Sequence, residues 1–450
     1  MSNILIKGAK VVNEGRIALL DVLIEGERIV AIEANMPVTS DMEVIDARGK
    51  FLLPGCIDDQ VHFREPGLTH KATIGTESKA CLAGGITSFL EMPNTHPQTT
   101  TAQAYNNKLD VAAQTSWVNY GFLFGGTNDN LEEIKAIDPK TTPGLKLFLG
   151  SSTGNMLVDD PDTLKKIFSV FQLPIAVHCE DEQTVSANLA EYINKYGDDI
   201  PIEHHPDIRS AEACYLSSSK AIALAKETGA RLHVFHLSTA RETALFQNDV
   251  PLAKKQITSE VCIHHLWFSD EDYAQKGTHI KWNPAVKTAA DRAGLWEALN
   301  DDRIDIIATD HAPHTLEEKD QVYTKAPSGG PMVQHALAVM LECVNQGKIT
   351  LEKVVEKMCH NPAILFSIKE RGYIKTGYYA DLVLVDLNQV QTITRDNLLY
   401  KCGWSPLEGT TLRGAVTHTF LNGTLMYEHG NITEANHAKP LSFTKIGRAV

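Results

Sequence analysis

Five residues of the types that bind metal ions stand at the ends of short apolar runs. They are His62, Lys146, His178, His236 and Asp310. A single histidine in such a place is more often a hydrogen-bonded residue of the core or rim than a ligand. Three histidines and an aspartate in the same place favour a metal site instead, because imidazole and carboxylate are both zinc ligands. The set therefore predicts a metal centre.

Two members of this set could also do chemistry of their own. Lys146 lies among aliphatic residues, where burial favours the neutral amine. A neutral amine can take up carbon dioxide and form a carbamate that bridges two metal ions; a lysine reaching solvent is the alternative. Asp310 could carry a proton between a metal-bound hydroxide and a leaving nitrogen, or it could cap the following turn.

A possible anion-binding group follows the first of the metal-type histidines. Gln60, His62 and Arg64 are spaced two apart, so their side chains share one face of a strand and Arg64 lies nearest its end. A guanidinium above the metal would suit bidentate binding of a substrate carboxylate. Pairing of Arg64 with its neighbour Glu65 is the alternative.

Eight short apolar runs that alternate with helical stretches could position these residues. They are 56–62, 85–92, 117–124, 144–149, 174–178, 231–236, 256–261 and 304–310. Strands separated by helices indicate parallel βαβ units, and eight of them close a barrel whose site lies at the carboxyl ends of the strands. We therefore predict an α/β fold, a (β/α)8 TIM-like barrel over residues 54–368, with the loop-rich segment 315–331 bordering the site.

The two ends of the chain have a different texture from the middle. Residues 1–53 and 369–450 contain segments in which apolar and polar residues alternate, which is typical of antiparallel strands. Each end alone is too small for a core of its own. We therefore expect the N- and C-terminal segments to form one small composite β domain.

Charge, hydropathy and cysteine content narrow the class of partner and the cellular compartment that we expect for the protein. The chain has 450 residues and a formal net charge of −14, which argues against nucleic acid or an anionic membrane as the partner. No window resembles a secretory signal or a membrane span, so we expect a cytoplasmic protein. Its 8 cysteines include no Cys-x-x-Cys pair, which predicts free, buried thiols.

Several motifs occur in an order typical of one enzyme family. They are His62-Phe63-Arg64-Glu65-Pro66-Gly67, Met92-Pro93-Asn94-Thr95, His264-His265-Leu266, Asn283-Pro284 and Thr309-Asp310-His311-Ala312-Pro313-His314. Together they resemble the dihydroorotase branch of the amidohydrolase superfamily, over essentially the whole chain. Hydantoinases and allantoinases share the barrel and the metal chemistry, whereas Arg64 and Asn94 match the positions with which dihydroorotases hold the substrate carboxylate.

The resemblance implies roles for particular residues. His62 and Asp310 would hold one zinc and His178 and His236 the other, with carboxylated Lys146 and a hydroxide between them. The reaction would be the reversible cyclisation of N-carbamoyl-L-aspartate to L-dihydroorotate in pyrimidine synthesis, with zinc-bound hydroxide attacking the ring amide in reverse and Asp310 as the catalytic acid and base. The implied substrate-binding residues are His62, Arg64, Asn94, Asn283, His314, Ser328 and Gly329.

One departure from the family pattern leaves alternatives open. The family usually has Asp-x-His-x-His, and here Gln60 replaces the first histidine. An amide oxygen is a poorer zinc ligand than imidazole, so the site could hold one zinc or two. Gln60 also keeps open an inactive, structural partner of aspartate transcarbamoylase, and a hydantoinase or dihydropyrimidinase is the alternative among enzymes. The sequence does not decide between a monomer and a homodimer.

Overall fold

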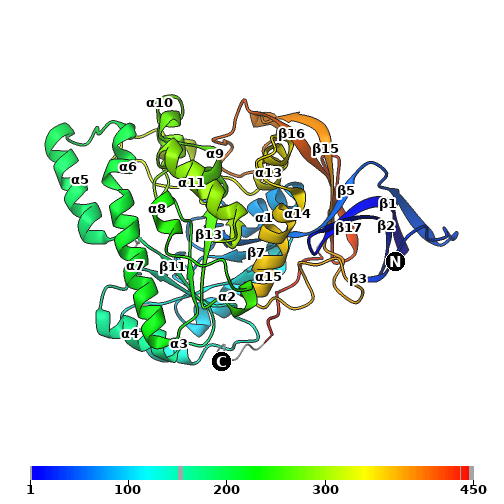
Figure 1. Ribbon diagram of the computed structural model, residues 1–450, viewed down its shortest axis with the longest axis horizontal. Coiled ribbons are helices and arrows are strands. Elements are labelled where there is room, and N and C mark those ends of the chain that lie inside the picture. Colours follow the sequence, from blue (N-terminus) through cyan, green and yellow to red (C-terminus); the bar gives the residue numbers. More distant parts are fainter. Residues whose placement is uncertain (1–2, 151–155, 436, 445–450) are drawn as a thin grey trace.

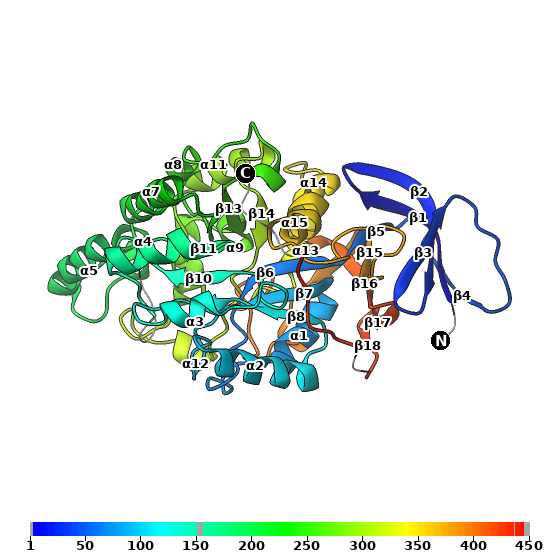
Figure 2. The same cartoon turned by 90° about the horizontal axis from the view of Figure 1, so that it is seen from below.

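The chain folds into a ring of strands surrounded by helices, with a sheet at one end. The computed structural model describes residues 3–150, 156–435 and 437–444. Figures 1 and 2 show the helices on the outside of the strands and the sheet at the right, where blue and orange-red segments from the two chain ends lie side by side. This arrangement confirms the predicted fold class.

All eight predicted barrel strands are present. They are β6 (Cys56–Val61), β7 (Ile86–Glu91), β8 (Asn119–Phe122) continued by β9 (Phe124–Gly125), β10 (Leu145–Phe148), β11 (Ile175–His178), β12 (Leu232–Val234), β13 (Ile257–Cys262) and β14 (Ile306–Ala308). Neighbours in the order β6-β7-β8 and β9-β10-β11-β12-β13-β14 pair in parallel. The ring closes where the His62 N–H donates to the His311 carbonyl, at 2.7 Å.

The third predicted strand is broken, which the apolar run did not indicate. The Leu123 N–H bonds to Glu91 of β7, whereas the Phe124 N–H bonds to Gly144, next to β10. Leu123 is buried in a cluster with Ala176 and other residues inside the ring. The strand therefore changes partner at Leu123, and the wall of the barrel continues through the change.

The first barrel strand contains a bulge. Asp58 is opposite Phe89 and Val61 is opposite Glu91, so β6 has one residue more than β7 between these pairs. An extra residue lets two consecutive side chains point to the same side. The bulge accounts for Asp59 meeting His233 inside the barrel while Gln60 still lines the pocket.

Helices cover the outside of the ring. They are α1 (Ile74–Ala83), α2 (Ala102–Thr115), α3 (Leu131–Lys135), α4 (Pro161–Val170), α5 (Glu182–Tyr196), α6 (His205–Ile208), α7 (Ala211–Thr228), α8 (Ala240–Thr243), α9 (Ile263–Trp267), α10 (Tyr273–Lys276), α11 (Ala289–Asn300), α12 (Leu316–Lys319), α13 (Ala336–Asn345), α14 (Leu351–Val355) and α15 (Asn361–Leu365). The longest, α7, begins where Ser210 accepts the Ala213 N–H and ends at Gly229, whose φ of 75° suits glycine.

Other features of the helical layer bear on the sequence predictions. The segment 315–331, predicted to be loop-rich, contains the short helix α12, which the Thr315 side chain caps. Across 3–150, 156–435 and 437–444, no helix combines the length and the apolar composition that crossing a membrane requires. All eight cysteines are free, and seven of them are buried, as predicted.

The end sheet combines strands from the N- and C-terminal segments of the chain, as predicted, although residues 440–443 leave it and bond to Tyr120 and Lys140 of the barrel. Its strands are β1 (Asn3–Asn13), β2 (Arg16–Glu25), β3 (Arg28–Glu33), β4 (Met42–Asp46), β5 (Phe51–Pro54), β15 (Leu382–Thr392), β16 (Thr411–Leu421), β17 (Thr424–Glu428) and β18 (Asn431–Ile432). Their order is β18-β17-β16-β15-β5-β1-β2-β3, with β4 beside β1. β5 pairs with β15 from Phe51↔Val385 to Pro54↔Leu382, and β6 begins two residues after β5, so β5 joins the sheet to the barrel.

A buried polar cluster fastens the sheet to the barrel. Asp381, just before β15, pairs with Arg371 and accepts the Asn422 N–H at 2.8 Å. It also accepts from the side chain of Asn119 on β8, at 3.1 Å. Both members of the ion pair are buried, so each compensates a charge that would otherwise be costly.

Candidate active site

A single pocket of about 230 Å³ collects the residues that the sequence singled out. It lies at the carboxyl ends of the barrel strands, where polar side chains from different strands converge. Its lining includes Gln60, His62, Arg64, Asn94, Lys146, His178, His236, Asn283, Asp310, His314, Ser328 and Gly329. The structure therefore brings every predicted site residue together, and it adds Phe148, Trp282, Ala312 and Pro327, for which the sequence offered no signal.

His178 and His236 face each other across one side of the pocket. Nδ1 of His178 lies 3.0 Å from Nε2 of His236. The other nitrogen of His178, Nε2, lies 3.0 Å from Glu180, which also pairs with Arg209. A carboxylate accepts only, so Nε2 carries the proton and Nδ1 has a free lone pair. The sequence did not single out Glu180, although it follows His178 by only two residues.

His62 and Asp310 face each other on the other side. His62 Nε2 lies 3.1 Å from the Asp310 carboxylate, and His62 Nδ1 lies 2.8 Å from the Asn94 side-chain oxygen. The Asn94 oxygen accepts from Nδ1, so Nε2 and the Asp310 carboxylate, which face each other, are the two atoms that could bind one metal ion between them. Asn94 thus orients His62 through its oxygen, and its amide group remains to face the pocket.

Lys146 lies between these two pairs in an apolar setting. Only 1% of its surface is exposed, and its Nζ lies 4.1 Å from the centre of the Phe235 ring. Burial lowers the pKa of Lys146 to about 7, although nearby Glu260 and Asp310 oppose this change. The amine is therefore substantially neutral at physiological pH, which is the form that reacts with carbon dioxide.

These donors fit zinc. Two ligands of a tetrahedral zinc at bond lengths of about 2.0–2.1 Å lie roughly 3.3 Å apart, close to the 3.0 Å between the His178 and His236 nitrogens. The Glu180 and Asn94 contacts are those by which neighbouring groups usually hold metal-binding histidines in place. Nitrogen and carboxylate donors, with an amine that can become a carbamate, form a chemically suitable set.

Arg64 contributes a buried positive charge to the pocket wall. Its guanidinium donates to the Pro313 carbonyl at 3.0 Å and lies 3.0 Å from His314, and the residue is only 8% exposed. Glu65, the alternative partner, accepts the Ile74 N–H instead. Within the described parts of the chain, no carboxylate forms an ion pair with Arg64, and burial lowers its pKa to about 10. The charge is thus available to an anion.

The wall next to Arg64 is held by a chain of hydrogen bonds. His314 Nε2 lies 3.0 Å from the Ser328 carbonyl, so it carries the proton, and Lys71 donates to Nδ1 at 2.9 Å. The Ser328 hydroxyl donates to the Asn283 side-chain oxygen at 2.9 Å. Lys71 was missed, because nothing in the sequence indicates that it lies against His314.

Gln60 lies at the floor of the pocket, next to a second group of ionisable residues. Its side-chain oxygen accepts from the Cys262 thiol at 3.5 Å. Below it, ligand atoms of Asp59, His233 and Glu260 lie within 4.8 Å of one another, and this buried group could hold a metal ion. Burial lowers the pKa of His233, but bonds to Asp59 and Glu260 outweigh it and raise the pKa to about 9.

Comparisons with known proteins agree with this geometry. The Amidohydrolase family matches residues 51–426. A dihydroorotase from Methanosarcina mazei is 33% identical over 420 residues, which cover 91% of each chain. A dihydroorotase from Carboxydothermus hydrogenoformans is 35% identical over 435 residues, covering 94% of this chain and 98% of the relative.

Solved structures show the same architecture. The L-hydantoinase (dihydropyrimidinase) of Arthrobacter aurescens superposes with a TM-score of 0.92 at 28% identity, covering 98% of this chain and 100% of the other. The family match spans most of the chain, and the curated relatives are similar along nearly their whole length. The chain therefore belongs to the amidohydrolase family.

Proposed function

We propose that the chain is a zinc-dependent dihydroorotase of pyrimidine synthesis. It would interconvert N-carbamoyl-L-aspartate and L-dihydroorotate, with loss of one water on ring closure. Relatives named dihydroorotase, at 33–35% identity over more than nine-tenths of the chain, support this assignment. Its eight free cysteines suit the cytoplasm, where thiols stay reduced.

The observation that carries the proposal is the unpaired charge of Arg64. A buried guanidinium without a carboxylate partner costs free energy unless a ligand supplies the anion. Dihydroorotate carries a carboxylate on its ring, whereas the simple cyclic amides do not. Arg64 would bind this carboxylate, assisted by the Asn94 amide group and by His314, and Asn283 and the Ser328–Gly329 backbone would border the ring.

Zinc ions held by His62, His178, His236, Asp310 and carboxylated Lys146 would lower the pKa of a water towards neutrality and polarise the ring carbonyl. The protein's own groups then handle the protons. In the hydrolytic direction Asp310 accepts a proton from the attacking water and passes it to the ring nitrogen as the amide bond breaks. Ring closure follows the same steps in reverse.

Two alternatives make different predictions. The hydantoinase (dihydropyrimidinase) structure of similar fold favours a hydrolase that does not require a carboxylate on the ring. Gln60, in place of a histidine, favours an inactive protein that acts only as a structural partner of aspartate transcarbamoylase. Substrate preference separates the first alternative from the proposal, and any turnover rules out the second.

The test compares two substrates and two variants of the zinc-loaded protein. We expect turnover of dihydroorotate and little of dihydrouracil, which has the same ring without the carboxylate. Arg64→Met should lower kcat/KM for dihydroorotate roughly 100-fold, since charged hydrogen bonds contribute about 1.5–3 kcal/mol each. Arg395→Met, which removes an exposed arginine paired with Glu408, is the control. Turnover of dihydrouracil but not dihydroorotate would instead show a hydantoinase.

A further inference from the structure

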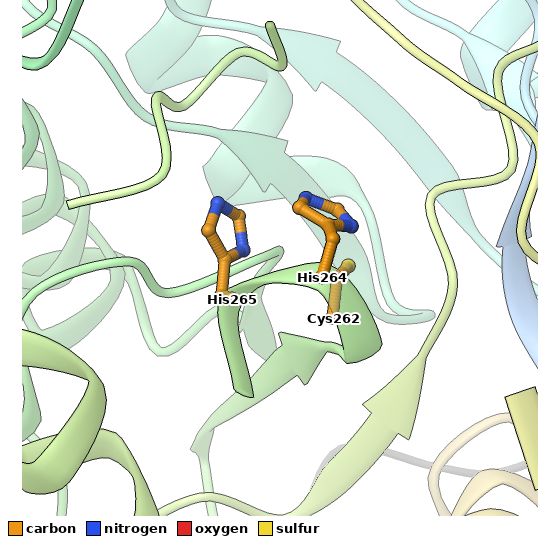
Figure 3. A group of neighbouring side chains, drawn as sticks. All are labelled: Cys262, His264 and His265. Carbon is orange, nitrogen blue, oxygen red and sulfur yellow. The ribbon is translucent and has the colours of Figure 1, made fainter. Parts of the chain in front are cut away.

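Three potential metal ligands meet behind the pocket, outside the set described above. Cys262 is the last residue of β13, and His264 and His265 lie in the first turn of α9. Figure 3 shows that their side chains project in the same direction from neighbouring positions. The sulfur and one nitrogen of each ring lie within 4.8 Å of one another, and the residues are 0–2% exposed.

The two histidines leave hydrogen-bonding atoms unused in the interior. Among the described residues, Nδ1 of His265 has no hydrogen-bond partner, and neither nitrogen of His264 has one of ordinary geometry, although the Thr309 backbone lies near that ring. A buried polar atom without a partner costs about 1–3 kcal/mol. Three such atoms in two adjacent rings therefore require an occupant or another source of compensation.

The orientation of His265 points to a metal ion as that occupant. Its Nε2 lies 3.1 Å from the Pro284 carbonyl, which can only accept, so Nε2 carries the proton. The lone pair is then on Nδ1, the nitrogen without a partner. A histidine that donates one N–H to a backbone carbonyl and offers its other nitrogen has the usual orientation of a metal ligand.

The Trp282 ring separates Cys262, His264 and His265 from the pocket. The His264 ring stacks on Trp282 with centroids 4.3 Å apart and an angle of 13°, and Trp282 lines the pocket. Cys262, His264 and His265 are absent from the pocket lining. Gln60 adjoins both places, because it lines the pocket and also accepts from the Cys262 thiol.

We propose that Cys262, His264 and His265 form a separate binding site for zinc or a similar thiophilic divalent cation. One thiolate and two imidazoles suit zinc, whereas magnesium and calcium prefer oxygen. Zinc ligands lie roughly 3.5 Å apart at bond lengths of about 2.0–2.3 Å, so ligand atoms within 4.8 Å of one another must close by about 1.3 Å at most. Binding releases the thiol proton to solvent, and the Gln60 oxygen is the nearest candidate for a fourth ligand.

Cobalt(II) is a direct probe, because a thiolate bound to cobalt gives a charge-transfer absorption that nitrogen and oxygen ligands do not. We expect this absorption in the full-length protein and its loss in Cys262→Ser, with one metal ion fewer per chain. It should persist in Cys343→Ser, which alters a buried thiol on α13. It should also persist in His178→Ala, which removes a ligand of the pocket.

A second measurement does not depend on the folding of Cys262→Ser. X-ray absorption at the zinc edge of the zinc-loaded His178→Ala protein should show one sulfur at about 2.3 Å. Zinc surrounded only by nitrogen and oxygen, together with cobalt protein lacking the thiolate absorption, would overturn the proposal. Neither measurement uses activity, so failure here leaves the proposed dihydroorotase reaction untouched.

Discussion

Glu180 shows that the candidate metal site depends on residues that orient its ligands without reaching the reacting atoms. It is fully buried and holds His178 through Nε2. Such contacts fix the ligand nitrogen and the ring orientation. The role of Glu180 follows from its contacts with His178 and Arg209 and could not be read from its type.

Replacing Glu180 should weaken zinc binding. Glu180→Ala leaves His178 free to rotate and to change tautomer, and we expect zinc affinity to fall about 10- to 100-fold. Competition with a chromophoric chelator measures the change. Glu227→Ala, which removes an exposed glutamate paired with Lys165, serves as control. Equal zinc affinity in Glu180→Ala and the control would mean that Glu180 does not orient the ligand.

Removing the Lys146 amine should abolish metal binding in the pocket and activity together. A carbamate bridge cannot form in Lys146→Ala, and short carboxylates such as formate or acetate added at high concentration should restore part of both. The matched control is Lys165→Ala on α4, where the lysine is exposed. If Lys146→Ala in a Cys262→Ser background retained two tightly bound zincs, the bridge would be wrong.

A substitution at Gln60 tests whether an amide side chain is enough for zinc binding at a position where the family usually has a histidine. Gln60→His should strengthen zinc binding in the pocket, because imidazole is the better ligand. Metal content is best counted in a Cys262→Ser background, so that the separate site proposed above adds nothing to the total. A parent protein that already binds two zincs firmly in the pocket would show that Gln60 is tolerated.

Among the elements, the strands of the barrel could be predicted and their irregularities could not. Apolar runs with polar residues at their ends located all eight strands, because the carboxyl ends of parallel strands face one site. The partner change at Leu123 and the bulge next to Asp59 arise from closing the ring, which depends on strands far away in sequence. The alternation of apolar and polar residues along a strand cannot indicate either the partner change or the bulge.

Helix α13 should make stability depend on pH. Burial lowers the pKa of His335, at its N-terminus, to about 4, compared with 6.5 in the unfolded chain. Below pH 6.5 the unfolded chain takes up a proton that the folded chain does not, so stability falls as the pH falls from 6.5 towards 4 and is fully present above 6.5. At pH 5.5 the loss from this residue is about 1 kcal/mol.

Urea unfolding at pH 7.5 and 5.5 checks this, with His335→Asn as the comparison. Asparagine does not titrate and keeps a polar group near the Tyr400 hydroxyl, which lies 3.2 Å from His335. We expect the difference in free energy of unfolding between the two pH values to shrink by about 1 kcal/mol in this variant. An unchanged difference would exclude His335 as a source of the pH dependence.

For the molecule as a whole, the composite sheet was predictable because neither end of the chain can bury enough apolar surface alone. The polar cluster that joins sheet and barrel was not, since Asn119, Arg371, Asp381 and Asn422 are scattered over 300 residues. Similarly, Arg64 and Asn94 could be assigned from their motifs. Trp282 reaches the pocket, and Lys71 reaches His314 in its wall, only through the packing of distant segments.

Breaking this cluster should destabilise both parts at once. Asp381→Ala leaves Arg371 buried without its partner, and such losses cost about 3–5 kcal/mol. The free energy of unfolding should fall by this amount. Asp386→Ala, a partly exposed site on the same strand, should change it by less than about 0.5 kcal/mol. Similar losses in the two variants would mean that the cluster does not fasten sheet to barrel.

The pairing of β5 with β15 has a consequence for how the protein is made. About 330 residues separate the two strands, and a ribosome adding roughly 5–20 residues per second needs about 15–65 s to supply the missing neighbour. During that time the nascent chain carries an open strand edge, the kind of surface that recruits unwanted partners. The time that translation takes, rather than the rate of any folding step, therefore sets how long the exposed edge of β5 must be protected.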